Sequence, residues 1–360
     1  MIVLASDYED QLLNSYEITK QSVIEGFGLS ESKEEISFYV EPYDTPRFWE
    51  LLEKATGLIT AFITVDDAFL DKAPNLKMIS VNATGYNSLD MDALKRHGVA
   101  MSHITAYCTR EVSEHAITLM LALNKNLPQY ADEICVRKKW KYMDLAPRRT
   151  VDHLTLTIFG FGRIGRETSK LANALGMKVQ AVDPYVKEDD AKEYDVKMVD
   201  LEEALKTSDV VINHMVLNAS TANYFNKEFF EGLKKKPIFI NVGRGGSVDE
   251  QALLEALQNG SICSAGLDVL TDEDPDIGNC PFAKMSNVLL TPHSAFYSED
   301  SNRALEEISG RSMGMFLAGN TDKIPGFIGR EIANKCVAFT TLLSVATIPL
   351  LQVVLTKIMF

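Results

Sequence analysis

The sequence predicts an α/β fold with two parallel-sheet domains, and three observations support this prediction. At 360 residues the chain is long for a single compact core. Its N-terminal part holds short apolar or β-branched runs separated by stretches of helical character, at 2–5, 36–40, 58–63 and 77–82. A longer series of strands then alternates with helices, at 154–159, 179–182, 210–213, 238–242, 264–269 and 288–291. This second alternation predicts a doubly wound sheet.

The longest predicted helix spans 109–126 and lies between the two series of strands. Its sequence, TREVSEHAITLMLALNKN, has apolar residues at helical spacing and an acidic first turn, so we expect a long and well-buried helix. Shorter helices are predicted at 163–175 and 250–259. The basic segment VRKKWKYMDLAPRR at 136–149 has no clear pattern and is interpreted as a connector. The helix at 109–126 is therefore expected to bridge the two domains.

The composition narrows the classes of partner. The chain has 46% hydrophobic and 24% charged residues, which is ordinary for a folded protein, and a net charge of -14. Nucleic acid and anionic membrane surfaces both require a basic face, so no nucleic-acid partner is expected. An anionic substrate would have to be attracted by a local positive site.

Cysteine usage and the first residues favour a cytoplasmic protein. The five cysteines are scattered and include no CxxC pair or other metal-ligand spacing. We therefore expect free thiols in a reducing compartment and no metal site. The first residues, MIVLASDYED, have no basic region before their apolar run, which predicts a first strand and not a signal peptide.

The segment 336–356, CVAFTTLLSVATIPLLQVVLT, has no charged residue. As a helix it would be long enough to cross a bilayer of about 30 Å. Pro349, Gln352 and several hydroxyl side chains weaken that interpretation, and the flanking lysines are not a strong basic signal. A helix packed on the body or on a partner subunit is favoured, a membrane anchor comes second, and a disordered end comes third.

A glycine-rich segment lies between a predicted strand and a predicted helix. The strand at 154–159 runs directly into Gly160-Phe161-Gly162-Arg163-Ile164-Gly165. In a dinucleotide site Gly160 would permit the tight turn, Gly162 would let a pyrophosphate approach the helix N-terminus, and Gly165 would allow helix and strand to pack closely. A turn without a ligand is the alternative, but the strand, the spacing and the helix together favour a cofactor site.

Asp183 follows the second strand of this unit, which ends in VQAV. A carboxylate at this point can accept hydrogen bonds from both ribose hydroxyls and would repel a 2′-phosphate. The sequence therefore favours NAD over NADP as the cofactor. A solvated acid at the end of a strand is the alternative interpretation.

Other ionisable residues follow later strands of the same series. Arg244 lies in NVGRGGSVDE, Asp268 and Glu273 lie in GLDVLTDED, and His293 follows VLLTP. Ligands of open α/β sheets bind beyond the carboxyl ends of the strands, so these side chains are candidates for one site. Histidine can protonate a carbonyl oxygen, a carboxylate can stabilise the cationic ring, and arginine can pair with a substrate carboxylate. Taken singly, each could be an ordinary loop residue.

Four segments in this order carry a resemblance to the D-isomer-specific 2-hydroxyacid dehydrogenases over about residues 1–330. They are ATGYNSLDMDALKRHGV (83–99), FGFGRIG with VDPY, NVGRGGSVDEQALLEAL (241–257), and GLDVLTDEDP with TPHSAFY. The ending PHSAFY is similar to the D-lactate and D-2-hydroxyisocaproate dehydrogenase branch. The resemblance implies an NAD-dependent enzyme that interconverts a small 2-oxo acid and its D-2-hydroxy acid.

The resemblance also implies an architecture of two Rossmann-like domains. A doubly wound NAD-binding domain at 105–297 would be inserted in a smaller flavodoxin-like substrate domain formed by 1–104 with 298–330. The substrate would bind between the domains, and the segment from 298 would be the returning helix. A homodimer is implied, with the helix at 110–126 close to its interface. The resemblance does not explain the hydrophobic extension 331–360.

Carried over residue by residue, the resemblance places the catalytic trio on Arg244, Glu273 and His293. It implies that backbone amides around Thr84 and Gly85 bind the substrate carboxylate, that Tyr107 faces the substrate, and that Asp268 lies near the nicotinamide carboxamide. Phe296 and Tyr297 would shape the pocket for the substrate side chain. The residues expected at the cofactor are Gly160, Gly162, Arg163, Ile164, Gly165, Asp183, His214, Val242, Gly243 and Asp268.

The chain departs from the family pattern at several positions. Asn82 stands where relatives often have arginine, Thr105 and Thr109 replace prolines beside Tyr107, and Val216 replaces another proline. None of these changes removes a catalytic group, but they leave the substrate open. A hydroxypyruvate, glyoxylate or phosphoglycerate oxidoreductase is the alternative enzyme. An NAD(H)-sensing binding module and a membrane-held dehydrogenase are alternatives of other classes.

Overall fold

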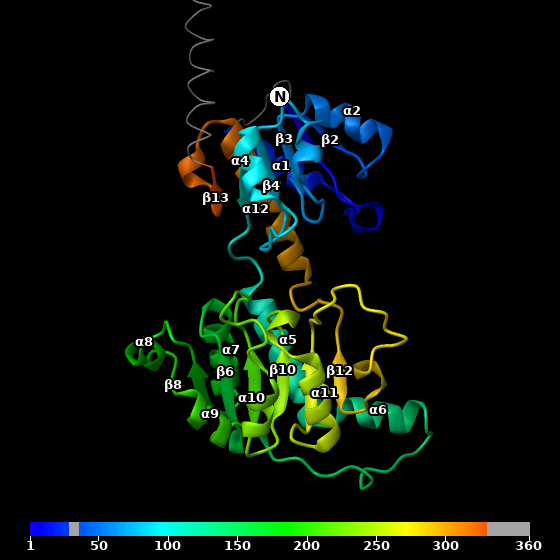
Figure 1. The fold of residues 1–360 in the computed structure, drawn as a ribbon, viewed down its shortest axis with the longest axis vertical. Helices are drawn as coiled ribbons and strands as arrows, with labels where there is room; N and C mark the ends of the chain where they lie inside the picture. Colours follow the sequence, from blue (N-terminus) through cyan, green and yellow to red (C-terminus); the bar gives the residue numbers. More distant parts are fainter. Residues whose placement is uncertain (29–35, 330–360) are drawn as a thin grey trace, which may run out of the picture. The chain divides into compact units, whose positions relative to one another are not determined.

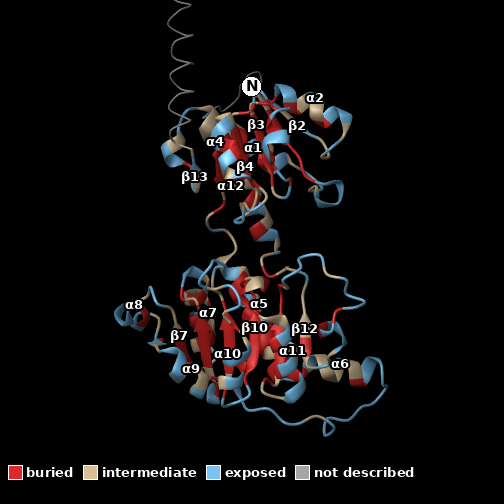
Figure 2. Ribbon diagram, in the orientation of Figure 1, coloured by how far each residue is buried: buried red, intermediate tan, exposed pale blue. Residues whose placement is uncertain are grey.

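The computed structural model describes residues 1–28 and 36–329. The chain divides into two compact units, one formed by Met1–Tyr107 with the segment from Glu299, and the other by Cys108–Ser298. Figure 1 shows the elements of each unit, and we describe the units separately. In both units the central strands are the most deeply buried elements and the helices expose their outer faces (Figure 2).

The smaller unit contains a six-stranded sheet. Five parallel strands follow the order β2-β1-β3-β4-β5, which is the flavodoxin-like order, and β13 adds an antiparallel edge next to β5. The strands are β1 (Ile2–Ala5), β2 (Ser37–Val40), β3 (Gly57–Thr60), β4 (Met78–Val81), β5 (Ala100–His103) and β13 (Phe327–Ile328). The helices are α1 (Glu17–Phe27), α2 (Pro46–Lys54), α3 (Asp67–Leu70), α4 (Met91–His97) and α12 (Glu299–Leu317), with short 3-10 turns η1 (Glu9–Gln11) and η5 (Thr321–Lys323).

Helices α1 and α12 pack closely in this unit because both have glycine at their contact. A Cβ added to Gly310 or Gly314 would collide with the carbonyl oxygen of Thr19 or Val23 in α1. The close approach joins the returning segment of the chain to the N-terminal part. Residues far apart in sequence therefore form one hydrophobic core with the sheet.

The larger unit contains a seven-stranded sheet in the order β12-β11-β10-β9-β6-β7-β8, and all its pairings are parallel. The order reverses between β6 and β9, which is the switch point of a Rossmann-like sheet. The strands are β6 (Thr155–Phe159), β7 (Lys178–Val182), β8 (Lys197–Met198), β9 (Val210–Asn213), β10 (Ile238–Asn241), β11 (Ser264–Leu267) and β12 (Val288–Leu290). The predicted fold class, with two parallel-sheet domains, is confirmed.

The helices of the larger unit surround this sheet. They are α5 (Thr109–Asn124), α6 (Leu127–Cys135), α7 (Arg163–Ala174), α8 (Glu188–Lys192), α9 (Leu201–Thr207), α10 (Lys227–Gly232) and α11 (Glu250–Asn259), with 3-10 turns η2 (Val151–His153), η3 (Gly245–Ser247) and η4 (Phe282–Lys284). Helix α5 packs against β10, β11 and α7 and is buried along one face, as its sequence predicted.

Several elements differ from the sequence prediction: α6, β8 and β13 were not predicted, and the clearest differences concern α5 and β5. The predicted helix at 109–126 ends at Asn124, because Asn126 adopts a left-handed conformation with φ +52° and α6 then starts at Leu127, with Pro128 in its first turn. Strand β5 was not predicted, because it follows directly on α4 and Gly98.

The C-terminal extension at 331–360 lies outside the described residues, and so do the packed-helix and membrane-anchor interpretations of 336–356. Within the part of the chain that the structure describes, no helix combines the length and the apolar character needed to span a membrane.

Candidate active site

The glycine-rich loop connects β6 to α7 at the switch point of the larger sheet. Gly160 has φ +88°, a conformation that glycine adopts without strain. A Cβ at Gly160 would also lie 2.8 Å from the Met215 backbone nitrogen, which follows β9. Only glycine can therefore occupy this turn beside the neighbouring strand.

The other two glycines meet different surroundings. A Cβ at Gly165 would collide with the Gly160 carbonyl oxygen and come within 3.2 Å of Ile158, so Gly165 lets α7 pack on β6. At Gly162, the residue before α7, no atom lies within 4 Å of an added Cβ. Close packing beneath the loop and open space in front of the α7 N-terminus fit a bound pyrophosphate.

Asp183 lies at the end of β7 and faces this loop. Its carboxylate accepts hydrogen bonds from the backbone N–H groups of Phe161, at 2.8 Å, and Tyr185, at 2.9 Å. Each carboxylate oxygen can accept a further bond, so the ribose hydroxyls of a dinucleotide still have acceptors here. The residues at the loop therefore fit NAD.

His214 follows β9 and lies beneath the glycine loop. Its Nε2 is 2.9 Å from the Thr168 hydroxyl on α7, while Nδ1 is buried without a hydrogen-bond partner among the described residues. Burial lowers the pKa of His214 to about 3, so the ring is neutral at ordinary pH. Its contacts link α7 to β9, and the predicted contact with the cofactor stays a prediction.

Arg244 is held by a buried polar network that sequence reasoning missed. Asn213 Nδ2 donates to Asn241 Oδ1 at 2.9 Å and to Ser247 Oγ at 2.8 Å, and all three residues are buried. Asn241 and Ser247 in turn donate to the Arg244 carbonyl oxygen. The only signal in the sequence was an asparagine at the end of each of two apolar strands.

The side chain of Arg244 is half-buried and donates from Nη1 to the Gly243 carbonyl oxygen at 2.8 Å. Among residues 1–28 and 36–329, no carboxylate forms an ion pair with Arg244. Its charge is therefore available to an anion. Val242 and Gly243 are buried beside it, and Gly243 approaches Asn213 closely.

The loop of Arg244 packs against the loop that carries Glu273. A Cβ at Gly245 would collide with the backbone of Leu270. Further along, Glu273 Oε2 lies 2.7 Å from His293 Nδ1. The structure thus brings together the predicted histidine and carboxylate from two different strand ends. Both side chains are partly exposed, at 43% for His293 and 53% for Glu273, so the pair orients the ring more than it stabilises the fold.

His293 itself lies in a turn built around Asp268. The histidine has φ +49°, and its N–H donates to the Asp268 carbonyl oxygen at 2.8 Å. The Asp268 carboxylate, which is buried, accepts from the N–H groups of Ser294 and Ala295 and from the Thr291 hydroxyl. Asp268 therefore shapes the turn, while its predicted place near the nicotinamide stays a prediction.

Aromatic side chains lie beside His293. The Phe296 ring is 6.2 Å from the His293 ring and nearly perpendicular to it, and Tyr297 is at the same distance beyond Phe296. Tyr297 is 71% exposed. Arg163 is exposed and Ile164 is partly buried at the start of α7.

Thr84, Gly85 and Tyr107 lie in the smaller unit. The Thr84 carbonyl oxygen accepts from His103 Nδ1 at 3.0 Å, and no atom lies within 4 Å of a Cβ added to Gly85. This loop follows β4 at the carboxyl edge of its sheet. Across residues 1–28 and 36–329, no group of three His, Cys, Asp or Glu side chains is placed to hold a metal ion.

Comparisons with known proteins agree with this geometry. The family model "D-isomer specific 2-hydroxyacid dehydrogenase, NAD binding domain" matches residues 117–295. The chain is 35% identical over 285 residues to glycerate dehydrogenase of Methylorubrum extorquens, covering 76% of this chain and 88% of that one. It is 34% identical to hydroxypyruvate reductase of Blautia hydrogenotrophica, covering 69% of this chain and 78% of that one.

Solved structures show the same similarity. The structure of D-lactate dehydrogenase from Aquifex aeolicus, complexed with NAD and lactic acid, superposes with a TM-score of 0.74 at 27% identity. The match covers 91% of this chain and 99% of that one.

A glycine loop at a switch point, an acid at the end of the next strand and a histidine–carboxylate pair are the features of an NAD-dependent dehydrogenase. The chain belongs to the D-isomer specific 2-hydroxyacid dehydrogenases. It is an NAD-dependent oxidoreductase that interconverts a 2-oxo acid and a D-2-hydroxy acid. The predictions of family, cofactor and enzymatic function are thereby confirmed.

Proposed function

We propose that His293 is the acid/base of the reaction, that Glu273 orients it, and that Arg244 binds the substrate. The observation that carries this proposal is the 2.7 Å contact between His293 Nδ1 and Glu273 Oε2. A carboxylate can only accept, so Nδ1 carries the proton of this bond. Nε2 is then the nitrogen that protonates the carbonyl oxygen during reduction and takes the proton back during oxidation.

Arg244 supplies the positive site that the acidic chain requires for an anionic substrate. Its guanidinium has no carboxylate partner among the described residues and sits on a loop held by Asn241 and Ser247. An arginine in this state can pair with the substrate carboxylate and polarise the adjacent carbonyl. Because the loop is already held in place, the Arg244 guanidinium does not have to reorganise, at a cost in free energy, when the substrate reacts.

NADH, when bound, supplies the hydride that reduces the carbonyl carbon. The residues that would hold it are Gly162 at the α7 N-terminus, Asp183 for the ribose hydroxyls, and the loop residues Val242 and Gly243. The packing of Gly160 and Gly165 beneath the loop supports these roles.

We assign the substrate side chain to the aromatic pair Phe296 and Tyr297, because the Phe296 ring lies next to the His293 ring and the Tyr297 ring lies next to that of Phe296. The roles of Thr84, Gly85 and Tyr107 in binding the substrate carboxylate stay predictions from the family resemblance. Substitution of Tyr107 by phenylalanine, with KM as the readout, tests the last of these.

The substrate is a small 2-oxo acid, and two candidates follow from the comparisons. Pyruvate is favoured by the similarity to a D-lactate dehydrogenase that covers almost the whole described chain. Hydroxypyruvate or glyoxylate is the second candidate, because the relatives with higher identity are a glycerate dehydrogenase and a hydroxypyruvate reductase.

The test is NADH oxidation by the purified protein across pyruvate, 2-oxoisocaproate, phenylpyruvate, hydroxypyruvate and glyoxylate. Arg244→Ala should reduce kcat/KM by about 10³-fold on the best substrate. Arg303→Ala, which removes an exposed arginine paired with Glu307, is the matched control and should leave turnover unchanged. Binding of NADH without turnover of any 2-oxo acid would contradict the proposal.

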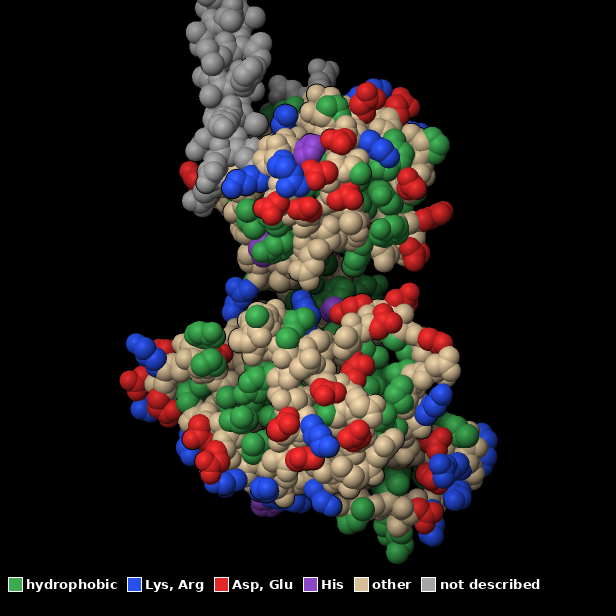
Figure 3. All heavy atoms as spheres, in the orientation of Figure 1, with side chains coloured by type: hydrophobic (Ala, Val, Ile, Leu, Met, Phe, Trp, Pro, Cys, Tyr) green, Lys and Arg blue, Asp and Glu red, His purple; other side chains and the backbone are tan. Residues whose placement is uncertain are grey.

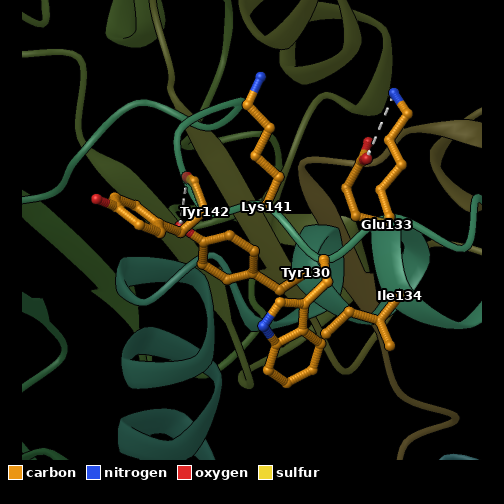
Figure 4. Close-up of a pocket in the computed structure, with 7 residues that line it drawn as sticks. Tyr130, Glu133, Ile134, Lys141 and Tyr142 are labelled. Carbon is orange, nitrogen blue, oxygen red and sulfur yellow. Dashed lines mark hydrogen bonds and ion pairs between the residues drawn. The ribbon is translucent and has the colours of Figure 1, made fainter.

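We further propose that the protein is a homodimer that buries α6 and the segment after it, next to α5. Five large side chains form an exposed patch here, which we call the α6 patch: Ile134, Val136, Trp140, Tyr142 and Met143. Trp140 is 90% exposed and Tyr142 76%. Figure 4 shows Tyr130 and Ile134 of α6 and Tyr142 around a hollow of about 300 Å³.

Apolar patches of this kind mark interfaces, and a second copy of the chain is the occupant that the family resemblance implies. Light scattering should give the mass of two chains, and Trp140→Glu should shift the protein toward one chain. Val40→Ser, on an exposed side chain of the smaller unit, is the control. A wild-type protein with the mass of one chain would contradict the proposal.

We propose a cytoplasmic location because the described cysteines are free thiols. Cys108, Cys135, Cys263 and Cys280 are all free thiols, as expected in a reducing compartment.

On the face drawn in Figure 3, acidic and basic side chains of the described residues are intermixed, and that face has no broad basic area. This distribution supports a small-molecule substrate over a nucleic-acid partner.

A further inference from the structure

A second histidine, His115, contacts the turn that carries His293. It lies on α5, and its Nε2 is 2.9 Å from the Thr291 hydroxyl and 3.5 Å from Asp268 Oδ1. The Thr291 hydroxyl is 2.5 Å from the same Asp268 oxygen. Since an ionised carboxylate cannot donate, the single hydroxyl proton of Thr291 goes to Asp268. Thr291 then accepts from His115, whose proton is on Nε2.

This chain of hydrogen bonds ends at the backbone of the turn from Thr291 to Ala295, which we call the histidine turn. Asp268 accepts from the N–H groups of Ser294 and Ala295 at 2.9 and 3.0 Å. Together with the bond from the His293 N–H to the Asp268 carbonyl, these contacts hold His293 at φ +49°. A left-handed conformation is unfavourable for a residue with a Cβ, so it persists only where other contacts enforce it.

The same helix also contacts the start of α7, where the glycine loop ends. Arg110 Nη1 donates to Glu167 of α7 at 2.9 Å, and the Ser113 hydroxyl lies 3.2 Å from the Ile164 carbonyl oxygen. Helix α5 is therefore bonded both to the first turns of α7, which follow the glycine loop, and to the turn that carries His293. A shift of α5 would change their separation.

We propose that His115 and Thr291 are positioning residues for the reaction. By donating to Thr291, His115 fixes the orientation of the hydroxyl that donates to the Asp268 carboxylate. The carboxylate in turn holds the backbone of the turn that positions the His293 ring. This inference rests on the proposed acid/base role of His293. It predicts that loss of the His115 contact lowers the rate of the chemical step while substrate and cofactor still bind.

The test uses the full-length protein with NADH and its best 2-oxo acid. His115→Met and Thr291→Val remove one bond each, and each should lower kcat about tenfold. KM and the NADH Kd, measured by fluorescence titration, should stay within about twofold of the wild type. His115→Gln and Thr291→Ser keep a donor and a hydroxyl and should restore most of the rate.

The double variant should lose no more than the larger single loss, because both changes interrupt one pathway. Thr118→Val, on an exposed position of the same helix, is the matched control. A kcat within about twofold of the wild type in both His115→Met and Thr291→Val would overturn the inference, and so would an equal loss of NADH affinity. A wild-type protein without turnover would contradict the proposed function itself. Failure of the proposed function can thus be distinguished from failure of the His115–Thr291 inference, which is measured relative to an active wild type.

Discussion

The segment from Gly160 to Gly165, which forms the loop after β6 and the start of α7, contains three glycines, whereas the turn from Thr291 to Ala295 contains none. Both cross the carboxyl edge of the same sheet, and both include a residue with positive φ, Gly160 at +88° and His293 at +49°. The glycine loop takes its shape from residues without a Cβ. The histidine turn takes its shape from Asp268, which precedes it in the chain by the whole of η4 and β12.

The difference shows two ways to build a functional loop. Local composition gives the glycine loop its backbone conformation and leaves open space for a ligand at Gly162. The histidine turn depends on long-range hydrogen bonds to a buried carboxylate, so it can hold a reactive side chain that glycine could not provide. Four predictions test this comparison.

The largest effect is expected at the histidine turn itself. His293→Gln removes the proton donor without changing the loop around Gly162, so kcat should fall on the order of 10³-fold while the NADH Kd is retained. Steady-state kinetics and fluorescence titration measure the two quantities. His97→Gln, on the partly exposed histidine of α4, serves as the control. A loss of NADH binding equal to the loss in kcat would show that the two loops are not independent.

At the glycine loop, two similar substitutions should have different effects. Gly165→Ala forces a Cβ against the Gly160 carbonyl and should lower the free energy of unfolding by about 2 to 3 kcal/mol. Gly162→Ala meets open space, so stability should change by less than about 0.5 kcal/mol while NADH affinity falls. Denaturant unfolding and NADH titration check both. Equal destabilisation by the two variants would refute the roles assigned to these glycines.

His214, beneath the glycine loop, makes stability depend on pH. Burial lowers its pKa to about 3 in the folded protein, whereas the unfolded chain titrates near 6.5. The unfolded state therefore binds the extra proton between these values. The contribution of the neutral ring to the free energy of unfolding is full above pH 6.5 and is lost as the pH falls toward 3. The loss amounts to about 2 kcal/mol at pH 5.

His214→Gln should remove this component, so the difference in unfolding free energy between wild type and variant should shrink from pH 7 to pH 5. Urea unfolding at the two pH values provides the measurement. A difference that is the same at both pH values would mean that His214 is solvated or protonated in the folded state.

The smallest effect is expected at Asp183. Asp183→Asn keeps an acceptor for the Phe161 N–H but removes the negative charge, so the preference for NADH over NADPH should fall by about tenfold. The ratio of kcat/KM values for the two cofactors is the measurement. An unchanged ratio would show that other residues decide the cofactor preference.

Much of the active site could be predicted because its residues follow strands. In parallel sheets the carboxyl ends of the strands share one edge, so Arg244, Glu273 and His293 were expected to meet, and the His293–Glu273 contact agrees. The supporting groups could not be predicted. Asn213 and Ser247 bond across separate elements, and no local pattern distinguishes them from ordinary polar residues.

By itself the sequence determined the α/β class, the glycine loop and the preference for NAD. These follow from periodicity and from the backbone freedom of glycine, which are properties of neighbouring residues. Only the tertiary structure decided which groups hold the catalytic side chains, such as Asp268 with Thr291 and His115 behind His293. Hydrogen bonds between residues distant in sequence exist only once the sheet brings the strand ends together, because until then each group is bonded to water.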